Sequence, residues 1–256
     1  MSKSANPGSG VIITGGASGI GLASAEAQAE VGRPVAIWDI NTERSVAVAA
    51  DLADRFGVAT VGVGVDLSAM ANIAPALEQT RAALPSIGGL VHAAGISLAV
   101  PVAEMTEAQW DAVLNVNLKA LPFMVQQLRS LLATQPGSAI VAIASINATL
   151  GNQMNPAYTA SKGGMLSLVR SLADDLARDG IRINSVTPGY ILTPMMQPVV
   201  EHLDPGHFER PVMLGRMGAP REVAAAVRFL LSDDASYITA AELVVDGGTI
   251  ASQRTR

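Results

Sequence analysis

Tyr158 and Lys162 stand four residues apart in a segment that the sequence predicts to be helical, so both side chains should lie on one face of the helix. A tyrosine hydroxyl, with a pKa of about 10, is a poor base at neutral pH. A lysine ammonium group beside it would favour the phenolate. Ser145 precedes Tyr158 by 13 residues and ends a predicted strand. Its hydroxyl could hold a substrate oxygen while the tyrosine exchanges a proton with it, although a Tyr-x-x-x-Lys pair alone is common on helix surfaces.

A glycine-rich segment, TGGASGIG, could hold a dinucleotide beside these side chains. It begins in the apolar run Val11–Thr14 and precedes the helix candidate Leu22–Glu30. Gly15 and Gly19 can let the backbone approach a pyrophosphate, and Gly21 can let the helix sit close to the sheet. An ordinary glycine-rich turn is the alternative, but the flanking strand and helix favour the dinucleotide site.

Two carboxylates could bind the adenosine half of the dinucleotide. Asp39 ends the second apolar run, where a carboxylate takes the ribose hydroxyls and repels the additional phosphate of NADP, so the sequence predicts NAD. Neither Ser18 nor Ile40 offers a cation for that phosphate, and Arg44 is expected on a solvated helix face. Asp66, at the end of the third run, either contacts adenine through its neighbouring backbone or caps the next helix.

These residues are spaced along an alternation of short apolar runs and alanine-rich helical stretches. Nearly continuous apolar runs are typical of parallel strands that are buried on both faces. The alternation predicts a single α/β domain over residues 11–250 with a doubly wound Rossmann fold, in which about seven parallel strands carry helices on both faces. The predicted strands are Val11–Thr14, Val35–Asp39, Thr60–Asp66, Leu90–Ala94, Ala139–Ser145, Arg182–Thr187 and Glu242–Asp246.

Capping signals predict where several helices begin and end. Thr106 starts a capping box, and Pro220 should open the last helix. Asn155 is the expected N-cap of a helix that has Pro156 at its first position and stops at Gly180.

The segment Tyr190–Gly218 breaks the alternation with four prolines, which prevent a long helix or regular strand. We expect it to cross the carboxyl edge of the sheet, where open α/β sheets bind ligands, and to act as a mobile lid. A rigid loop packed against the sheet edge is the alternative.

Composition argues against several classes of function. A net charge of −5 offers no basic face for nucleic acid, and the absence of cysteine removes disulfides and thiolate metal sites. His202 and His207 do not show ligand spacing with any carboxylate cluster, so no catalytic metal is predicted. No apolar run reaches the roughly 18 residues of a membrane span. Residues 1–10 and 251–256 are expected to be flexible tails without a secretory signal, and the protein is expected to be cytoplasmic.

In combination these motifs resemble the short-chain dehydrogenase/reductase family over nearly the whole chain, from Val11 to Gly248. The resemblance implies an oxidoreductase that moves a hydride between NAD(H) and a secondary alcohol or ketone, with the hydride chemistry belonging to the cofactor. The matching segments, in chain order, are Thr14–Gly21, Asn117, Ser145, Tyr158, Lys162, Pro188–Thr193 and Asp246–Gly248.

The resemblance also implies a role for each site residue. Tyr158 would be the general acid and base, Lys162 would lower its pKa and bind ribose, Ser145 would polarise the substrate carbonyl, and Asn117 would hold a water at a helix kink. The implied cofactor contacts are Gly15, Ser18, Gly19, Ile20, Gly21, Asp39, Ile40, Asp66, Leu67, Ala93, Gly95, Tyr158, Lys162, Pro188, Gly189, Ile191 and Thr193.

Family geometry places the substrate between side chains of two kinds. Asn147 and Gln153 could hydrogen-bond a sugar, polyol or hydroxy acid, whereas methionines and Leu203 could wrap a bulky apolar ketone, and the sequence leaves both open. The expected walls are Ser97, Asn147, Gln153, Met154, Tyr190, Met195 and Met196, with residues 199–202 in the lid.

The chain departs from the family pattern in two places. Ala93 stands where the family has an asparagine that braces the central sheet, and the preceding His92 either substitutes for it or is simply a buried, hydrogen-bonded histidine. Ala240 stands where a glycine commonly follows threonine, which puts the local turn in question.

Family members commonly form tetramers through the helices that match those of Asn117 and Tyr158, so a homotetramer is expected beside the small-molecule substrate. Two other functions stay open. The fold also serves dinucleotide-binding sensors or regulators, and non-redox enzymes such as epimerases. The presence of Tyr158 and Lys162 favours the oxidoreductase over the first, and the length of 256 residues leaves little room for the extra substrate domain of the second.

Overall fold

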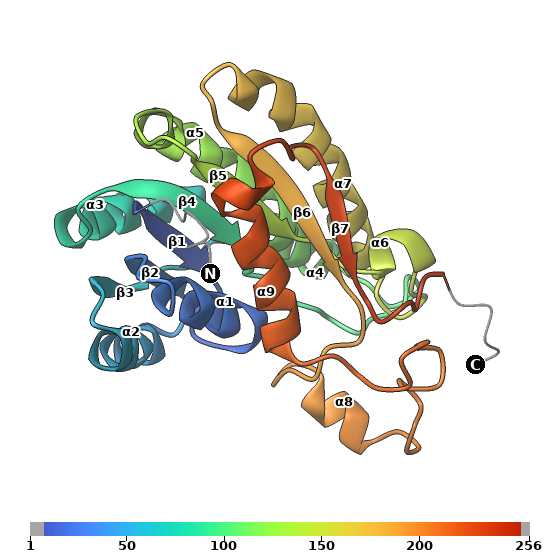
Figure 1. The fold of residues 1–256 in the computed structure, drawn as a ribbon. Helices are drawn as coiled ribbons and strands as arrows, with labels where there is room; N and C mark the ends of the chain where they lie inside the picture. Colours follow the sequence, from blue (N-terminus) through green and yellow to red (C-terminus); the bar gives the residue numbers. More distant parts are fainter. Residues whose placement is uncertain (1–7, 252–256) are drawn as a thin grey trace.

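The computed structural model describes residues 8–251 and places all seven predicted strands in one parallel sheet (Figure 1). The first strand in the chain lies inside the sheet. The next two strands extend the sheet to one edge and the last four extend it to the other edge, which is the predicted doubly wound arrangement. Gly10, expected in a tail, already belongs to the first strand, and the other tail residues lie mostly outside the described part. In order across the sheet the strands are β3 (Thr60–Gly64), β2 (Val35–Asp39), β1 (Gly10–Thr14), β4 (Ile87–His92), β5 (Ala139–Ile143), β6 (Arg182–Pro188) and β7 (Glu242–Val245).

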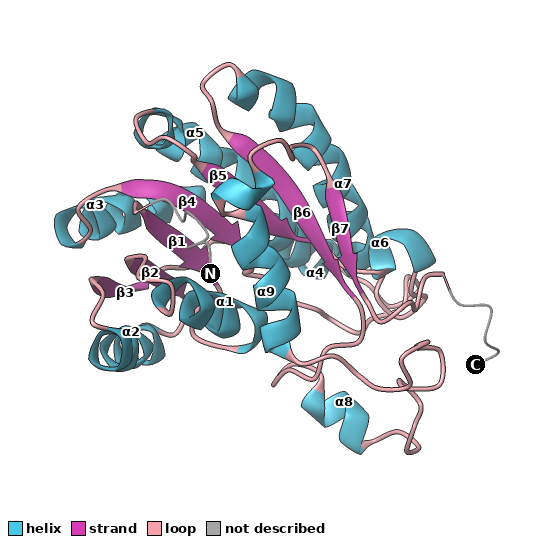
Figure 2. Ribbon diagram, in the orientation of Figure 1, coloured by secondary structure: helices cyan, strands magenta, loops and turns pink. Residues whose placement is uncertain are grey.

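Helices cover both faces of the sheet, as predicted (Figure 2). One face is covered by α1 (Gly19–Ala29), α2 (Thr42–Phe56) and α9 (Pro220–Leu230), and the other by α3 (Ile73–Ala83), α5 (Ala120–Ala133) and α7 (Pro156–Ala177). The remaining helices are α4 (Glu107–Leu114), α6 (Asn147–Leu150) and α8 (Gln197–Glu201), with a π-helical turn at Asn115–Lys119 and 3-10 turns at Met70–Asn72 and Asp233–Ala235. Within residues 8–251, no helix is both long enough and apolar enough to cross a membrane.

Alternate residues of the central strands point into the two helical layers. Ile12 of β1 packs under α3, α5 and α7, whereas Val11 and Ile13 pack under α1, α2 and α9. All three side chains are fully buried. A strand covered on both faces favours apolar residues at most positions, which is why the central strands are nearly continuous apolar runs in the sequence.

Two helix starts agree with their capping signals. The hydroxyl of Thr106 accepts a hydrogen bond from the backbone N–H of Gln109 at 3.3 Å, and the Gln109 side chain accepts one from the Thr106 N–H at 2.9 Å. This capping box opens α4, and Pro220 opens α9.

The start of α7 corrects one expectation. Asn155 precedes Pro156 as predicted, but its side chain makes no hydrogen bond to the helix. Its carbonyl oxygen Oδ1 instead accepts from the hydroxyl of Ser97 at 3.2 Å, a tertiary contact that competes with the local cap. At the other end the helix stops at Ala177, and the chain turns at Gly180 with φ of 71°.

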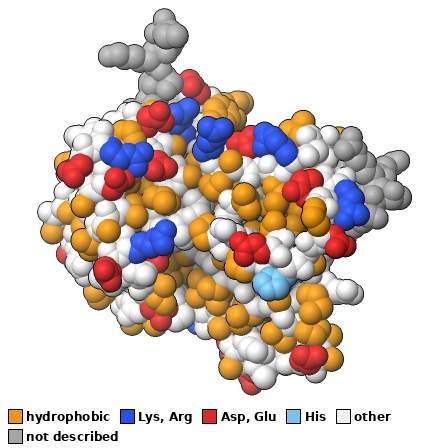
Figure 3. All heavy atoms as spheres, turned by 90° about the horizontal axis from the view of Figure 1, so that it is seen from below, with side chains coloured by type: hydrophobic (Ala, Val, Ile, Leu, Met, Phe, Trp, Pro, Cys, Tyr) orange, Lys and Arg blue, Asp and Glu red, His pale blue; other side chains and the backbone are white. Residues whose placement is uncertain are grey.

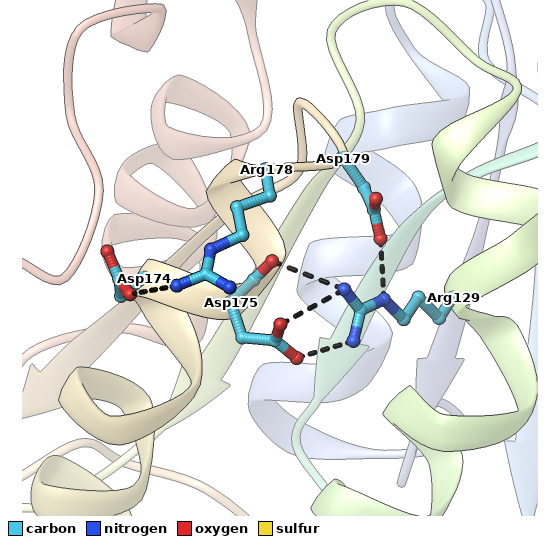
Figure 4. Close-up of polar contacts among 5 residues, drawn as sticks. All are labelled: Arg129, Asp174, Asp175, Arg178 and Asp179. Atoms are coloured by element: carbon cyan, nitrogen blue, oxygen red, sulfur yellow. Dashed lines mark hydrogen bonds and ion pairs between the residues drawn. The ribbon is translucent and has the colours of Figure 1, made fainter.

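A charged cluster ties α5 to the end of α7 (Figure 4). The guanidinium of Arg129 reaches between Asp175 and Asp179, with Nε donating to Asp179 at 2.5 Å and both Nη atoms donating to the Asp175 carboxylate. Arg178 turns the other way and donates to Asp174 at 3.2 Å. These side chains are largely exposed, so the cluster fixes the relative position of two helices more than it stabilises the fold.

The turn before β7 forms although it lacks the family glycine. Ala240 takes its place with φ of 59°, the left-handed conformation that glycine adopts without strain and alanine adopts at a cost of about 1 kcal/mol or more. Its N–H donates to the carbonyl oxygen of Ile183 at 2.8 Å, and the next N–H, of Ala241, donates to the side chain of Asn184 at 3.0 Å. These bonds hold the residue in the strained conformation.

Candidate active site

A cleft of about 1360 Å³ opens where the carboxyl ends of the strands meet the segment Tyr190–Gly218. Seen from the side of α8, hydrophobic side chains gather over the middle of this face (Figure 3). The cleft is lined by every predicted cofactor contact and every predicted substrate-wall residue. Of the four predicted catalytic residues, Ser145, Tyr158 and Lys162 line it, and Asn117 lies buried behind its wall.

Glycines shape the turn between β1 and α1 at one end of the cleft. Gly15 has φ of 63°, and a Cβ there would lie 2.9 Å from the backbone of Ala94. A Cβ at Gly21 would lie 2.1 Å from the carbonyl oxygen of Gly15, so this glycine lets the helix approach the turn itself rather than the sheet. Because α1 begins at Gly19, its first turn borders the cleft with N–H groups that have no partner inside the helix.

Asp39 is held at the end of β2 by backbone groups. Its Oδ2 accepts from the N–H of Ala17 at 3.1 Å, and its Oδ1 accepts from the N–H of Asn41 at 3.1 Å. Arg44 is exposed, as expected for a solvated helix face, but its side chain also contacts the turn. Its side chain turns back from the first turn of α2, and Nε donates to the carbonyl oxygen of Ala17 at 2.7 Å. Asp39 therefore binds the backbone N–H of Ala17 in the glycine-rich turn, and Arg44 binds the backbone carbonyl of the same residue.

Asp66 lines the cleft with Leu67, but it does not cap a helix. Its Oδ1 accepts from the N–H of Ser68 at 2.8 Å, and α3 begins only at Ile73. The carboxylate therefore stabilises the turn that leads away from β3, and the alternative of a direct N-cap is excluded.

Tyr158, Ser145 and Lys162 meet on one wall of the cleft. The hydroxyl of Tyr158 lies near the side chain of Ser145, which acts to lower its pKa. The Nζ of Lys162 lies 5.5 Å from the centre of the Tyr158 ring, on the same face of α7, and donates to the carbonyl oxygen of Ile143 at 2.7 Å. That carbonyl belongs to the last residue of β5, so the strand end positions the lysine.

Burial dominates the electrostatics of this group. Burial raises the pKa of Tyr158, and the hydrogen bond with Ser145 opposes the rise only in part. Burial also lowers the pKa of Lys162 to about 8. In the protein alone, the loss of hydration therefore outweighs the opposing interaction with Ser145, and the pKa of Tyr158 lies above its ordinary value.

Asn117 lies in the π-helical turn between α4 and α5, where a helix kink was expected. Its Oδ1 accepts from the N–H of Ile96 at 2.8 Å, and its Nδ2 donates to the Ile96 carbonyl at 3.0 Å and to the hydroxyl of Ser161 at 3.1 Å. The side chain of Asn117 therefore holds the backbone at Ile96, which follows β4 and lines the cleft.

The substrate end of the cleft carries both kinds of group that the sequence suggested. Asn147 and Gln153 line it, and within residues 8–251 their side chains have no hydrogen-bond partner. Met195 is 54% exposed, and the ring of Tyr190 packs against that of Phe208 with centroids 5.0 Å apart. The arrangement therefore leaves both a polar and an apolar substrate possible.

The segment Tyr190–Gly218 is anchored at its ends. The N–H of Gly218 donates to the carbonyl of Tyr190 at 2.9 Å, and the N–H of Leu192 donates to the carbonyl of Gly218 at 2.9 Å. Farther along, the N–H of Leu214 donates to the carbonyl of Gly247 at 3.2 Å. Between these anchors, α8 is only five residues long, as the prolines predict, and its backbone bonds are local. Any movement should therefore be confined to the part around α8.

Hydrogen exchange tests whether this part moves. With NAD alone, amides from Met195 to Phe208 should exchange fast, because few long-range bonds hold them. Adding a substrate analogue should slow them markedly, while amides of the Leu168–Leu176 helix stay slow throughout. Equal protection in all states would show that the segment is a fixed wall and that selection of substrate lies around Asn147 and Gln153.

Some groups at the site carried no signal in the sequence. The carbonyl of Ile143 and the hydroxyl of Ser161 act through contacts between distant elements. Arg44 could be suspected only from its position five residues after Asp39. Ala93 is part of the cleft wall, but the bracing of the neighbouring strands comes from His92.

The sheet order, the glycine-rich turn after β1 and the group of Tyr158, Ser145 and Lys162 define a Rossmann-type oxidoreductase that uses a nicotinamide dinucleotide. Residues 15–249 match the family model described as enoyl-(acyl carrier protein) reductase. The chain belongs to the short-chain dehydrogenase/reductase family.

Known relatives cover almost the whole chain. The D-threitol dehydrogenase of Mycolicibacterium smegmatis is 35% identical over 93% of this chain and 91% of that protein. The 3-oxoacyl-acyl-carrier-protein reductase FabG of Aquifex aeolicus is 35% identical over 93% of this chain and 95% of that protein. The crystal structure of a short-chain dehydrogenase/reductase, glucose/ribitol dehydrogenase, from Brucella melitensis is 32% identical with a TM-score of 0.87, and covers 95% of this chain and 97% of that one.

Proposed function

We propose that the protein is an NAD(H)-dependent alcohol dehydrogenase or ketoreductase that interconverts a secondary alcohol and a ketone. The carrying observation is that Tyr158, Ser145 and Lys162 form one wall of a cleft whose other end carries Asp39. This arrangement supports a site in which Tyr158 would carry the proton and Asp39 would bind the dinucleotide.

The residues of the cleft fit a bound dinucleotide. A Cβ at Gly15 or Gly21 would collide with backbone atoms, so only glycine leaves this turn open to phosphates. Asp39 would hold the adenosine ribose, Lys162 the nicotinamide ribose, and Ile191 and Thr193 would contact the carboxamide. When bound, the nicotinamide supplies the hydride acceptor for oxidation or the donor for reduction.

The side chains of the cleft then donate and accept the proton of the substrate oxygen. In reduction the Tyr158 hydroxyl gives its proton to the carbonyl oxygen, and in oxidation the phenolate removes the proton of the alcohol. Ser145 donates a hydrogen bond to the same oxygen and polarises it. The charge of Lys162, together with a positive nicotinamide during oxidation, offsets the effect of burial on the Tyr158 hydroxyl. Asn117 keeps the backbone of Ile96 in place beside them.

A substrate panel monitored by NADH absorbance tests the proposal. The panel should hold polyols, sugars and hydroxy acids, which suit Asn147 and Gln153, and apolar ketones, which suit Met195 and Leu203. The names of the relatives add D-threitol and a 3-oxoacyl thioester. Turnover of any member supports the oxidoreductase. Tight NADH binding with no turnover across the panel would favour a dinucleotide sensor, and conversion without a change in NADH would favour a non-redox enzyme.

We also propose that the protein is a cytoplasmic homotetramer. In α7, Met165, Val169 and Leu176 pack in the protein's own core, so these side chains are not available to a partner subunit. Trp110 of α4 and Phe123 of α5 instead remain about 40% exposed beside it.

Light scattering at micromolar concentration should report a tetramer, or at least a dimer, and a monomer would contradict the proposal. Phe123→Asp should shift the protein toward smaller species, because it puts a charge into an apolar contact. Val46→Asp is the matched control, since Val46 is also an exposed apolar residue but lies on another helix, α2.

A further inference from the structure

His92 is the last residue of β4 and is completely buried. Its Nδ1 lies 3.1 Å from the hydroxyl of Thr14, the residue that joins β1 to the glycine-rich turn. Its Nε2 lies 3.3 Å from the backbone carbonyl oxygen of Asn117. One imidazole ring thus connects the end of the first strand, the end of β4 and the π-helical turn.

The partners fix which nitrogen carries the proton. The carbonyl of Asn117 can only accept, so Nε2 of His92 must donate to it, and Nδ1 is then free to accept. The Thr14 hydroxyl already accepts from the N–H of Ala94 at 3.1 Å, so its own proton can go to Nδ1. Burial lowers the pKa of His92 to about 4, which keeps the ring neutral and in this one tautomer at ordinary pH.

We propose that His92 is a positioning residue that sets the place of Asn117 relative to the dinucleotide turn. The inference rests on the proposed function, because that function makes the place of Asn117 matter. The backbone bond from Nε2 holds the π-helical turn, and the side chain of Asn117 in turn holds Ile96 at the cleft wall. The bond from Thr14 ties the same ring to the strand that carries the glycine-rich turn.

Two amide substitutions separate the two bonds. In His92→Gln the amide nitrogen reaches about as far as Nε2 and can still donate to the Asn117 carbonyl. In His92→Asn the shorter side chain reaches only as far as Nδ1 and can still pair with Thr14. The loss of one buried hydrogen bond changes an equilibrium or rate by about five- to tenfold.

We expect a crossed result. His92→Asn should lower kcat about tenfold while the NADH dissociation constant changes less than threefold. His92→Gln should weaken NADH binding about fivefold while kcat changes less than threefold. A residue that only contributed stability would lower both quantities together, in step with Tm. Similar kcat losses in the two variants would therefore overturn the proposal.

Hydrogen exchange gives a second readout that needs no turnover. The N–H of Ile96 is held by Asn117, so its exchange should become about tenfold faster in His92→Asn and stay near the wild-type rate in His92→Gln. Ser138→Ala is the control, because it removes a buried hydroxyl with two carbonyl partners far from the cleft and should change Tm alone. Unchanged exchange of Ile96 in His92→Asn would overturn the proposal, even if the wild-type protein showed no oxidoreductase activity.

Discussion

Replacing Tyr158 by phenylalanine should lower kcat by at least the ~100-fold that is typical of a lost general acid or base, while NADH binds almost as tightly as before. The substitution keeps the ring that Lys162 faces and removes only the hydroxyl. Because Tyr158 lines the open cleft beside Ser145, loss of the hydroxyl takes away the proton carrier without creating an enclosed cavity.

The chain offers a matched control for this variant. Tyr237 is fully exposed and does not line the cleft, so Tyr237→Phe should leave kcat and NADH binding unchanged. If Tyr158→Phe retained most of its activity, another group would have to transfer the proton.

The pH profile gives an independent check of the same role. Burial raises the pKa of Tyr158, and oxidation needs its deprotonated form. The oxidative rate should therefore rise as pH goes from neutral to alkaline, and the profile of Tyr158→Phe should lose this rise. A flat wild-type profile would contradict the role unless product release limits the rate.

The central strands could be predicted from the sequence because β1, β4 and β5 are buried on both faces. Val11, Ile12 and Ile13 must all be apolar, and such a run needs no knowledge of its partners. The list of cleft residues came from the resemblance to the family, and it agrees with the rule that the carboxyl ends of parallel strands meet at one edge of the sheet. Residues as far apart as Asp39 and Thr193 consequently line one cleft.

Contacts that depend on the direction of one side chain could not be predicted. Asn155 has the residue type and position of an N-cap, yet Ser97 holds its side chain from a distant loop. The sequence left open whether His92 was an ordinary buried histidine or a brace, and its geometry makes it both buried and hydrogen-bonded to two elements. Arg44 is exposed, as a solvated helix face requires, but its long side chain still reaches a backbone carbonyl across the cleft edge.

Replacing Asp39 should also have a large effect, on the preference for NAD over NADP. The wild-type protein should strongly prefer NAD(H) over NADP(H) in kcat/KM, because Asp39 would bind the ribose hydroxyls and repel an added phosphate. Asp39→Ala should lower kcat/KM with NAD about 10- to 100-fold, the range expected for a lost hydrogen bond to a charged group. With Arg44 beside the same turn, the variant should also gain activity with NADP, since a guanidinium binds phosphate well.

Three further variants separate these effects. Asp39→Asn keeps an oxygen that can accept from the N–H of Ala17 but lacks the charge, so a gain with NADP in this variant would come from removed repulsion rather than from a rearranged turn. Asp39→Ala combined with Arg44→Ala should lose the gain with NADP, whereas Asp39→Ala combined with Glu43→Ala, a change at the neighbouring exposed residue, should keep it. Equal kcat/KM with the two cofactors in the wild-type protein would overturn the NAD assignment. A gain that survives the loss of Arg44 would show that repulsion by Asp39 alone sets the preference.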